Sequence, residues 1–173
     1  MSADGLPEPF LVLLVDDDLR TSRRLAEMLR EDGLAVELAR DGAAAIARFT
    51  HAPLPNVLVT ELTTAHVDAA SVSRFARAQR PGMPILVVTG YPNLFHPLAF
   101  GGKAPQLFTK PVDYSKLKDA LIQALQSSAE SSLEMSAKVV PAALESKLTD
   151  APALAGDTLS GAQTLRAVRR SRR

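Results

Sequence analysis

The chain of 173 residues contains no cysteine and no tryptophan, and the strongly apolar run near its start is short. Without cysteine it can form neither a disulfide framework nor a thiolate zinc site, and it has no cysteine nucleophile. The run from Phe10 to Val15 is too short to cross a bilayer and follows Asp4 and Glu8 rather than basic residues, so it is neither a signal peptide nor a membrane helix. These absences favour a cytoplasmic protein without a membrane partner.

Aromatic residues are few and unevenly distributed. The six phenylalanines and two tyrosines all lie between Phe10 and Tyr114, whereas serine, alanine and proline recur from Ser128 onward and the chain ends in RAVRRSRR. A segment without large apolar side chains buries little surface per residue. We therefore expect a flexible leader at 1–9, a folded domain at 10–127 and a mostly disordered tail at 128–173. The tail has a basic end and is too poor in apolar groups to form a DNA-binding output domain.

Two hydrophobic periodicities alternate within residues 10–127. Nearly continuous apolar runs, typical of strands that are covered on both faces, predict strands at 10–15, 34–39, 56–62, 84–89 and 106–109. Stretches with the helical period, one of them preceded by the capping residue Asp68, predict helices at 19–32, 42–50, 69–80 and 115–126. The alternation predicts an α/β fold, a doubly wound five-stranded parallel sheet with (βα)5 topology.

Polar residues follow the predicted strands at their carboxyl ends, which meet at one edge of a parallel sheet. Asp16 and Asp17 follow the first strand, Glu61 lies at the end of the third, Thr89 ends the fourth and Lys110 follows the fifth. Two or three carboxylates on adjacent strand ends suit Mg²⁺. A hydroxyl and an ammonium group opposite them can orient phosphoryl oxygens. The pattern predicts a metal-assisted phosphoryl site.

Five short motifs occur in order over roughly residues 10–125, namely LLVDDD, ARDGAAAI, PNVLVTEL, VVTG and FTKP. In these motifs and their spacing the chain resembles the receiver domain of bacterial two-component response regulators. The resemblance implies a flavodoxin-like fold, a role in phosphorelay signalling rather than as an enzyme, and a protein partner such as a histidine kinase or a signalling target. It also implies that Asp16 and Asp17 bind Mg²⁺, that Thr89 is the switch hydroxyl, and that Lys110 contacts the acceptor carboxylate or its phosphoryl group.

The phospho-acceptor position departs from the family, whose third strand ends in an aspartate where this sequence has Glu61. The extra methylene moves the carboxylate by more than about 1 Å, and such a misplacement costs on the order of 100-fold in rate. We expect a pseudo-receiver in which Glu61 reaches toward Lys110 and Thr89 and imitates the phosphorylated state, with Mg²⁺ binding weak or lost. Two alternatives stay open: Glu61 as an inert remnant, and Glu61 as the acceptor of an Mg²⁺-dependent single-domain response regulator.

Further departures concern the surface that such domains use for output. Leu107 stands where many receivers have an aromatic switch residue. After the fourth strand the stretch YPNLFHPLAFGGKA contains Pro92, Pro97 and two glycines, which predict a short or broken fourth helix. We expect a protein partner to bind the face formed by the fourth helix, the fifth strand and the fifth helix. A lower alternative is nucleic-acid binding through five arginines at the C-terminal end, Arg166, Arg169, Arg170, Arg172 and Arg173.

Overall fold

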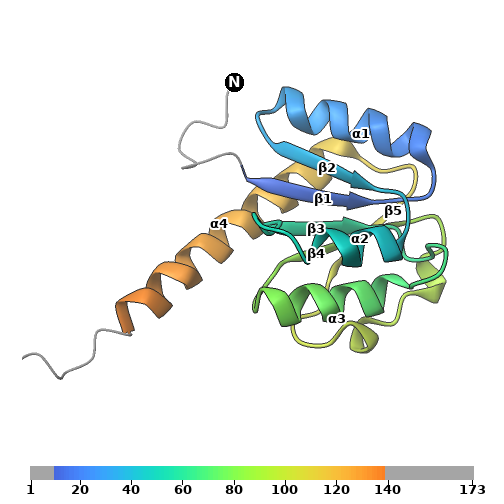
Figure 1. Cartoon of the computed structure of the whole chain (residues 1–173). Coiled ribbons are helices and arrows are strands. Elements are labelled where there is room, and N and C mark those ends of the chain that lie inside the picture. Colours follow the sequence, from blue (N-terminus) through green and yellow to red (C-terminus); the bar gives the residue numbers. More distant parts are fainter. Residues whose placement is uncertain (1–9, 139–173) are drawn as a thin grey trace, which may run out of the picture. The chain divides into compact units, whose positions relative to one another are not determined.

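The computed structural model describes residues 10–138. Its elements are, in chain order, β1 (Leu11–Val15), α1 (Leu19–Glu31), β2 (Ala35–Ala39), α2 (Gly42–Arg48), β3 (Val57–Thr60), α3 (Ala69–Gln79), β4 (Ile85–Thr89), the 3₁₀-helices η1 (Pro92–Leu94) and η2 (Pro97–Phe100), β5 (Gln106–Thr109) and α4 (Tyr114–Lys138). The strands form one parallel sheet in the order β2-β1-β3-β4-β5 (Figure 1). This confirms the predicted five-stranded parallel sheet, and the strand order is that of flavodoxin-like folds.

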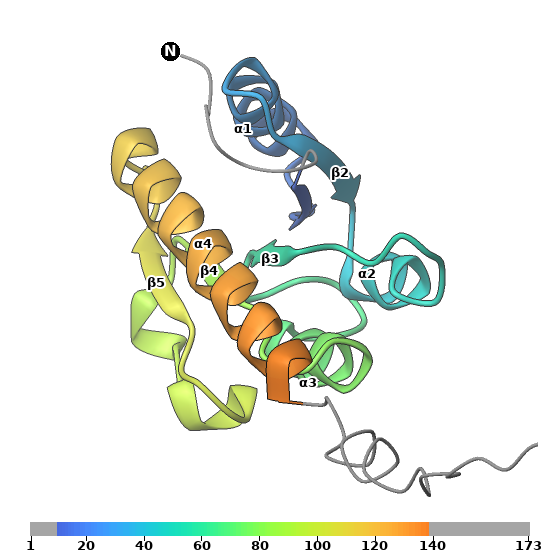
Figure 2. The same cartoon turned by 90° about the vertical axis from the view of Figure 1, so that its left-hand side faces the viewer.

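Helices cover both faces of the sheet. Because successive residues of a strand point to opposite sides, each strand contributes side chains to the core on both faces. Val12 and Leu14 of β1 belong to one apolar cluster together with residues of α1 and α4. Leu13 and Val15 belong to the other, together with residues of α2, α3 and η2. Figure 2 shows α1 and α4 on one side of the sheet and α2 and α3 on the other. Both faces are buried, which explains the continuous apolar runs of the strands.

Aspartates cap the N-termini of the first three helices. Asp18, Asp41 and Asp68 each accept a hydrogen bond from a backbone N–H in the first turn of α1, α2 and α3, respectively. These bonds satisfy donors that every helix leaves free at its start. The cap predicted at Asp68 is confirmed, and the three caps fix where the chain turns from each strand edge into the following helix.

The segment between β4 and β5 contains η1 and η2 in place of a regular helix. The broken helix predicted from Pro92 and Pro97 is therefore confirmed, since each proline lies at the start of a short 3₁₀-helix. Phe100 anchors the segment: its side chain is only 1% exposed and its ring centroid lies 5.4 Å from that of Phe95. Leu98, by contrast, is 96% exposed.

Two arginines of α3 hold this segment against the rest of the fold. Arg74 donates a hydrogen bond to the carbonyl of Ala99. Arg77 donates to the carbonyls of three further residues of the segment, Phe100, Gly101 and Lys103. Because the segment lacks the internal hydrogen bonds of an α-helix, these guanidinium groups satisfy carbonyls that a helix would satisfy itself.

α4 is the helix predicted at 115–126, and it is longer than expected. It continues to Lys138, so the domain boundary expected near Ser127 falls inside the helix. The leader at 1–9 and the tail from 139 onward, including the five terminal arginines, lie outside the described residues. Within residues 10–138, no helix is both long enough and apolar enough to cross a membrane.

Candidate functional site

The register of the strands brings the predicted site residues to one edge of the sheet. Val15 pairs with Thr60, so the residues that follow them, Asp16 and Glu61, are neighbours. The backbone N–H of Glu61 donates to the carbonyl of Val15 at 2.8 Å, which continues the pairing one residue beyond the strands. Lys110 follows β5 at the same edge. The backbone therefore places Asp16, Glu61 and Lys110 near one another.

Lys110 lies between two buried carboxylates. Its Nζ atom is 2.8 Å from Oδ2 of Asp16 and 2.7 Å from Oε2 of Glu61. The other oxygen of each carboxylate also has a partner, because the backbone N–H groups of Asp18 and Leu62 donate to Asp16 Oδ1 and Glu61 Oε1. Only 8% of the Asp16 side chain and 7% of the Glu61 side chain are exposed. The expected contact between Glu61 and Lys110 is present, and it links the ends of β1, β3 and β5.

The two carboxylates stabilise the positive charge of Lys110. Burial alone would lower the pKa of Lys110, but the hydrogen bonds and negative charges of Asp16 and Glu61 outweigh burial and raise that pKa above its usual value. Lys110 is therefore an ammonium ion at neutral pH, and it offsets one of the two negative charges beside it. An uncompensated carboxylate would be costly at this depth.

The two other predicted residues lie outside this cluster of contacts. Thr89 is fully buried, and its Oγ1 accepts a hydrogen bond from the backbone N–H of Tyr91. This bond ties the Thr89 hydroxyl to the start of the segment that carries η1 and η2. Asp17 is exposed, although it is adjacent in sequence to the buried Asp16.

The cluster also bears on the predicted Mg²⁺ site. Among residues 10–138, no group of three or more acidic or histidine side chains is placed to hold a metal ion. The ammonium group of Lys110 instead lies within hydrogen-bond distance of both Asp16 and Glu61. Of the two acids expected to bind Mg²⁺, Asp16 is therefore already paired with Lys110, and Asp17 is exposed.

A second polar cluster, which the sequence did not reveal, joins the end of α1 to the start of α4. Tyr114 donates its hydroxyl hydrogen to Asp32, and Nζ of Lys118 lies 2.9 Å from Oδ1 of Asp32. The bond from Tyr114, followed by the one from Lys118, lowers the pKa of Asp32, while burial and the bond to Asp32 raise the pKa of Tyr114. Tyr114 and Lys118 are one helical turn apart, but no sequence signal connects them with Asp32, which lies 82 and 86 positions earlier, respectively.

Comparison with known families decides what kind of domain carries this site. The family model described as the response regulator receiver domain matches residues 12–122. The chain belongs to the response regulator receiver family. Receiver domains are signalling modules of two-component systems, and in general they are not enzymes and bind Mg²⁺. In this chain Glu61, at the position expected to be the phospho-acceptor, contacts Lys110.

Two regulatory proteins are similar to this chain over part of their length. The acid tolerance regulatory protein ActR of Rhizobium meliloti is 34% identical over 113 residues, which cover 65% of this chain and 58% of ActR. The transcriptional regulatory protein ZraR of Salmonella typhimurium is 29% identical over 125 residues, which cover 72% of this chain but only 28% of ZraR. The match to each relative therefore spans less than two thirds of that relative.

Solved receiver structures agree with the fold. A response regulator receiver protein from Sinorhizobium medicae has a TM-score of 0.62 and 26% identity, covering 70% of this chain and 98% of its own. A CheY-like receiver domain protein from Methanospirillum hungatei has a TM-score of 0.64 and 24% identity, covering 72% of this chain and 99% of its own. In both, nearly the whole solved chain corresponds to the receiver part of this protein.

Proposed function

We propose that this receiver protein is a pseudo-receiver that signals by binding a protein partner and does not depend on phosphorylation. The observation that carries the proposal is the ion pair of 2.7 Å between Glu61 and Lys110 at the acceptor position. In this reading Glu61 supplies permanently the negative charge that a phosphoryl group would bring. The protein acts in the cytoplasm and is not an enzyme.

The surroundings of Glu61 support this role over that of an acceptor. A carboxylate that attacks phosphorus must present a free oxygen in line with the leaving group. Both oxygens of Glu61 are already engaged, one by Lys110 and the other by the backbone N–H of Leu62. Mg²⁺, which would offset charge in the reaction, is bound weakly or not at all in this proposal, because Nζ of Lys110 also contacts the carboxylate of Asp16.

The proposed partner surface comprises η1, η2, β5 and α4, the region expected to serve as the output face. Three large apolar side chains are exposed on η1, η2 and the residue before them, namely Tyr91, Leu94 and Leu98. Two short 3₁₀-helices present these exposed side chains in a different arrangement from that of a regular α-helix. They support a partner specific to this chain.

Phosphorylation with a small phosphodonor tests the proposal. The full-length protein is incubated with acetyl phosphate or phosphoramidate and Mg²⁺, and its intact mass is measured. We expect no added phosphate on the wild type. Wild-type phosphate that is stable to acid, labile to base and abolished by Glu61→Gln would overturn the proposal and establish Glu61 as an acceptor.

The Glu61→Asp variant provides the matched positive control. Shortening the side chain by one methylene withdraws the carboxylate from Lys110 and restores the residue that the family has at this position. We expect this variant to accept phosphate if Asp16, Thr89 and Lys110 retain their positions. If it also stays unmodified, the inertness does not come from the length of Glu61, and Glu61 is better described as the remnant of a decayed site.

A pull-down experiment tests the partner surface. The full-length protein is compared with a version that ends after Lys138, which leaves α4 whole, and with the substitution Leu98→Asp. We expect the same partner to be captured by both lengths and lost with Leu98→Asp. Loss on truncation alone would assign recognition to residues 139–173, where the alternative of nucleic-acid binding through the terminal arginines would then be tested.

A further inference from the structure

Residues 69–112 contain no aspartate and no glutamate, although they form α3, β4, β5 and both 3₁₀-helices. Lys110, which belongs to this range, is already paired with Asp16 and Glu61. The other basic residues of the range are Arg74, Arg77, Arg80 and Lys103. The charge that this part of the chain places on the surface is therefore positive only.

The charges of Arg74 and Arg77 have no carboxylate beside them. Both side chains donate to backbone carbonyls of the segment between β4 and β5, and a carbonyl group carries no net charge. Neither arginine, nor Lys103, takes part in an ion pair within residues 10–138. Burial lowers the pKa of Arg77, as expected for a partly desolvated cation without a counter-charge. A carboxylate brought by another molecule would balance this charge.

Leu98 is presented beside these cations. It precedes Ala99, whose carbonyl oxygen lies 2.5 Å from a guanidinium nitrogen of Arg74. The Leu98 side chain is 96% exposed, whereas Phe100 is 1% exposed and belongs to the apolar cluster that contains residues of α3. The buried ring thus holds η2 against α3 while Leu98 faces solvent. Leu98, Arg74, Arg77 and Lys103 are called the η2–α3 surface below.

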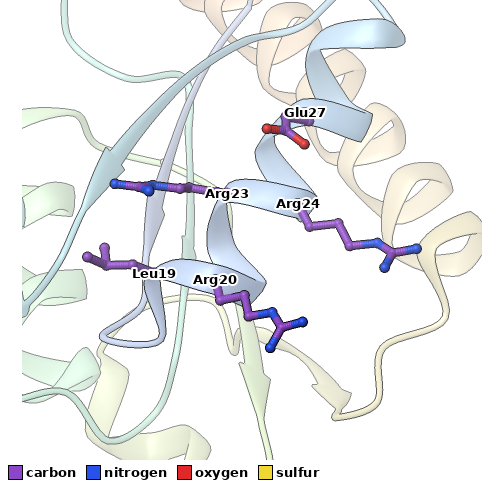
Figure 3. Close-up of a pocket in the computed structure, with 5 residues that line it drawn as sticks. All are labelled: Leu19, Arg20, Arg23, Arg24 and Glu27. Atoms are coloured by element: carbon purple, nitrogen blue, oxygen red, sulfur yellow. The ribbon is translucent and has the colours of Figure 1, made fainter.

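A second basic region, on α1, has a different composition. Figure 3 shows Leu19 and Glu27 of α1 among three arginines of the same helix. Here a glutamate accompanies the arginines, and the helix begins at the carboxylate of Asp18. The α1 region therefore carries charge of both signs. Because it also exposes a leucine, it supplies matched controls for the η2–α3 surface.

We propose that the η2–α3 surface binds an acidic segment of a protein partner, whose apolar side chains cover Leu98 and whose carboxylates face Arg74, Arg77 and Lys103. Charge complementarity favours carboxylates, and the exposed leucine favours a segment that also carries apolar side chains. A membrane fits less well, because electrostatic binding to anionic lipids usually takes a cluster of roughly four to eight basic residues. The inference rests on the proposed role of this region as a partner site, but not on the state of Glu61.

Titration of the ¹⁵N-labelled full-length protein with an acidic peptide tests the surface. The probe is a synthetic peptide with two repeats of Leu-Glu-Glu-Leu-Leu-Glu-Glu, which places leucines on one face of a helix. We expect saturable shifts of the backbone amides of Leu98 and Lys103, with a dissociation constant on the order of 100 µM. Raising NaCl from about 50 to about 300 mM should weaken binding at least about 3-fold, because salt screens exposed charges.

Two control peptides separate the apolar contribution from the charge. Replacing every leucine of the probe with serine removes the side chains that would cover Leu98, and should weaken binding at least about 10-fold. Replacing every glutamate with lysine reverses the charge, and should abolish the saturable shifts at Leu98 and Lys103. A lysine peptide that binds there as well as the glutamate peptide would contradict charge complementarity.

Matched variants of the protein locate the binding site. Leu98→Asp should weaken binding of the acidic peptide at least about 10-fold, and Lys103→Glu at least about 3-fold. Leu19→Asp and Arg23→Glu make the same kinds of change on α1 and should leave binding unchanged. All four positions are exposed, so the melting temperatures of the variants should stay close to that of the wild type.

Three further outcomes would overturn the proposal. One is the absence of saturable shifts at about ten times the expected dissociation constant. Another is a set of shifts centred on α1, which would assign acidic partners to that helix. The third is sedimentation with phosphatidylserine vesicles that is lost in Leu98→Asp, which would assign the surface to a membrane. Phosphate on wild-type Glu61, by contrast, would overturn the pseudo-receiver role and leave the peptide result standing.

Discussion

Two cationic side chains hold two different regions of this receiver together, and they do so by different means. Lys110 lies between the carboxylates of Asp16 and Glu61, at the edge of the sheet where strand ends meet. Arg77 donates to the backbone carbonyls of the segment between β4 and β5. In the first region the cation balances charge. In the second it satisfies carbonyls that the missing helix would have satisfied itself.

Because the two regions are held by different means, substitutions should affect them differently. The Lys110 cluster is positioned by strand register, so the identity of its side chains changes its chemistry but not its location. The segment with η1 and η2 has no such support from the sheet. Its shape depends on the buried ring of Phe100 and on Arg74 and Arg77, so substitutions there change the surface offered to a partner.

The largest expected effect comes from removing the anchor of the segment. Phe100→Ala should lower the free energy of unfolding by about 3 to 5 kcal/mol, because the ring is almost fully buried and its loss leaves a cavity. Urea denaturation followed by circular dichroism measures the change. Leu98→Ala, a substitution at an exposed position of the same segment, should change stability by less than about 0.5 kcal/mol. Similar effects of both substitutions would mean that Phe100 does not anchor the segment.

Removing the cation of the sheet-edge cluster comes next. Lys110→Met should cost about 3 kcal/mol at neutral pH, because it leaves Asp16 and Glu61 buried without a counter-charge. The control is Lys118→Met, which breaks a more exposed ion pair with Asp32 and should cost less than about 1 kcal/mol. Adding Glu61→Gln to Lys110→Met should recover part of the loss. A double variant no more stable than the single one would contradict the charge-balance explanation.

Removing the guanidinium group of Arg77, which holds the segment between β4 and β5, should have a smaller and more local effect on stability. Arg77→Met keeps the apolar stem but loses the bonds to Phe100, Gly101 and Lys103. We expect a loss of about 1 to 2 kcal/mol, because water can reach the exposed carbonyls. Amide hydrogen exchange should accelerate in residues 96–105 and stay unchanged in β1 and β3. Uniform acceleration across the sheet would show that Arg77 supports the whole fold.

The smallest effect concerns alkaline pH. The folded state raises the pKa of Lys110, so the stability that this residue contributes is complete below the unfolded value of 10.5 and is lost as the pH rises through the higher folded-state pKa. Glu61→Gln removes one of the two charges that raise the pKa and should reduce this loss. Unfolding free energies between about pH 9 and pH 12 measure it. Identical pH profiles for the two proteins would mean that Glu61 does not act on Lys110.

Much of the site could be predicted because it depends on sequence order. Continuous apolar runs indicated buried parallel strands, and parallel strands end at a common edge, so Asp16, Glu61 and Lys110 had to lie near one another. The interruption of the fourth helix was also predictable, since Pro92 and Pro97 each oppose a regular helix. The end of the helix predicted at 115–126 could not be read from the sequence, because the apolar positions that pack on the sheet end at Leu125 while the helix itself continues to Lys138.

Other features could not be predicted, because they depend on which side chains meet across elements. Arg77 looked like any polar residue of α3, and only the path of the chain after η2 brings its carbonyl partners within reach. Leu98 likewise gave no signal. Its exposure becomes visible only when the ring of Phe100 is packed into the core beside α3.

The parallel sheet, the order of its helices and a glutamate at the expected acceptor position follow from the sequence alone, because periodicity and strand ends are local properties of the chain. The partner of that glutamate depends on the tertiary structure. Three strand ends from distant parts of the sequence place Lys110 between two carboxylates, and no local pattern specifies the distances of 2.8 and 2.7 Å over which it contacts them.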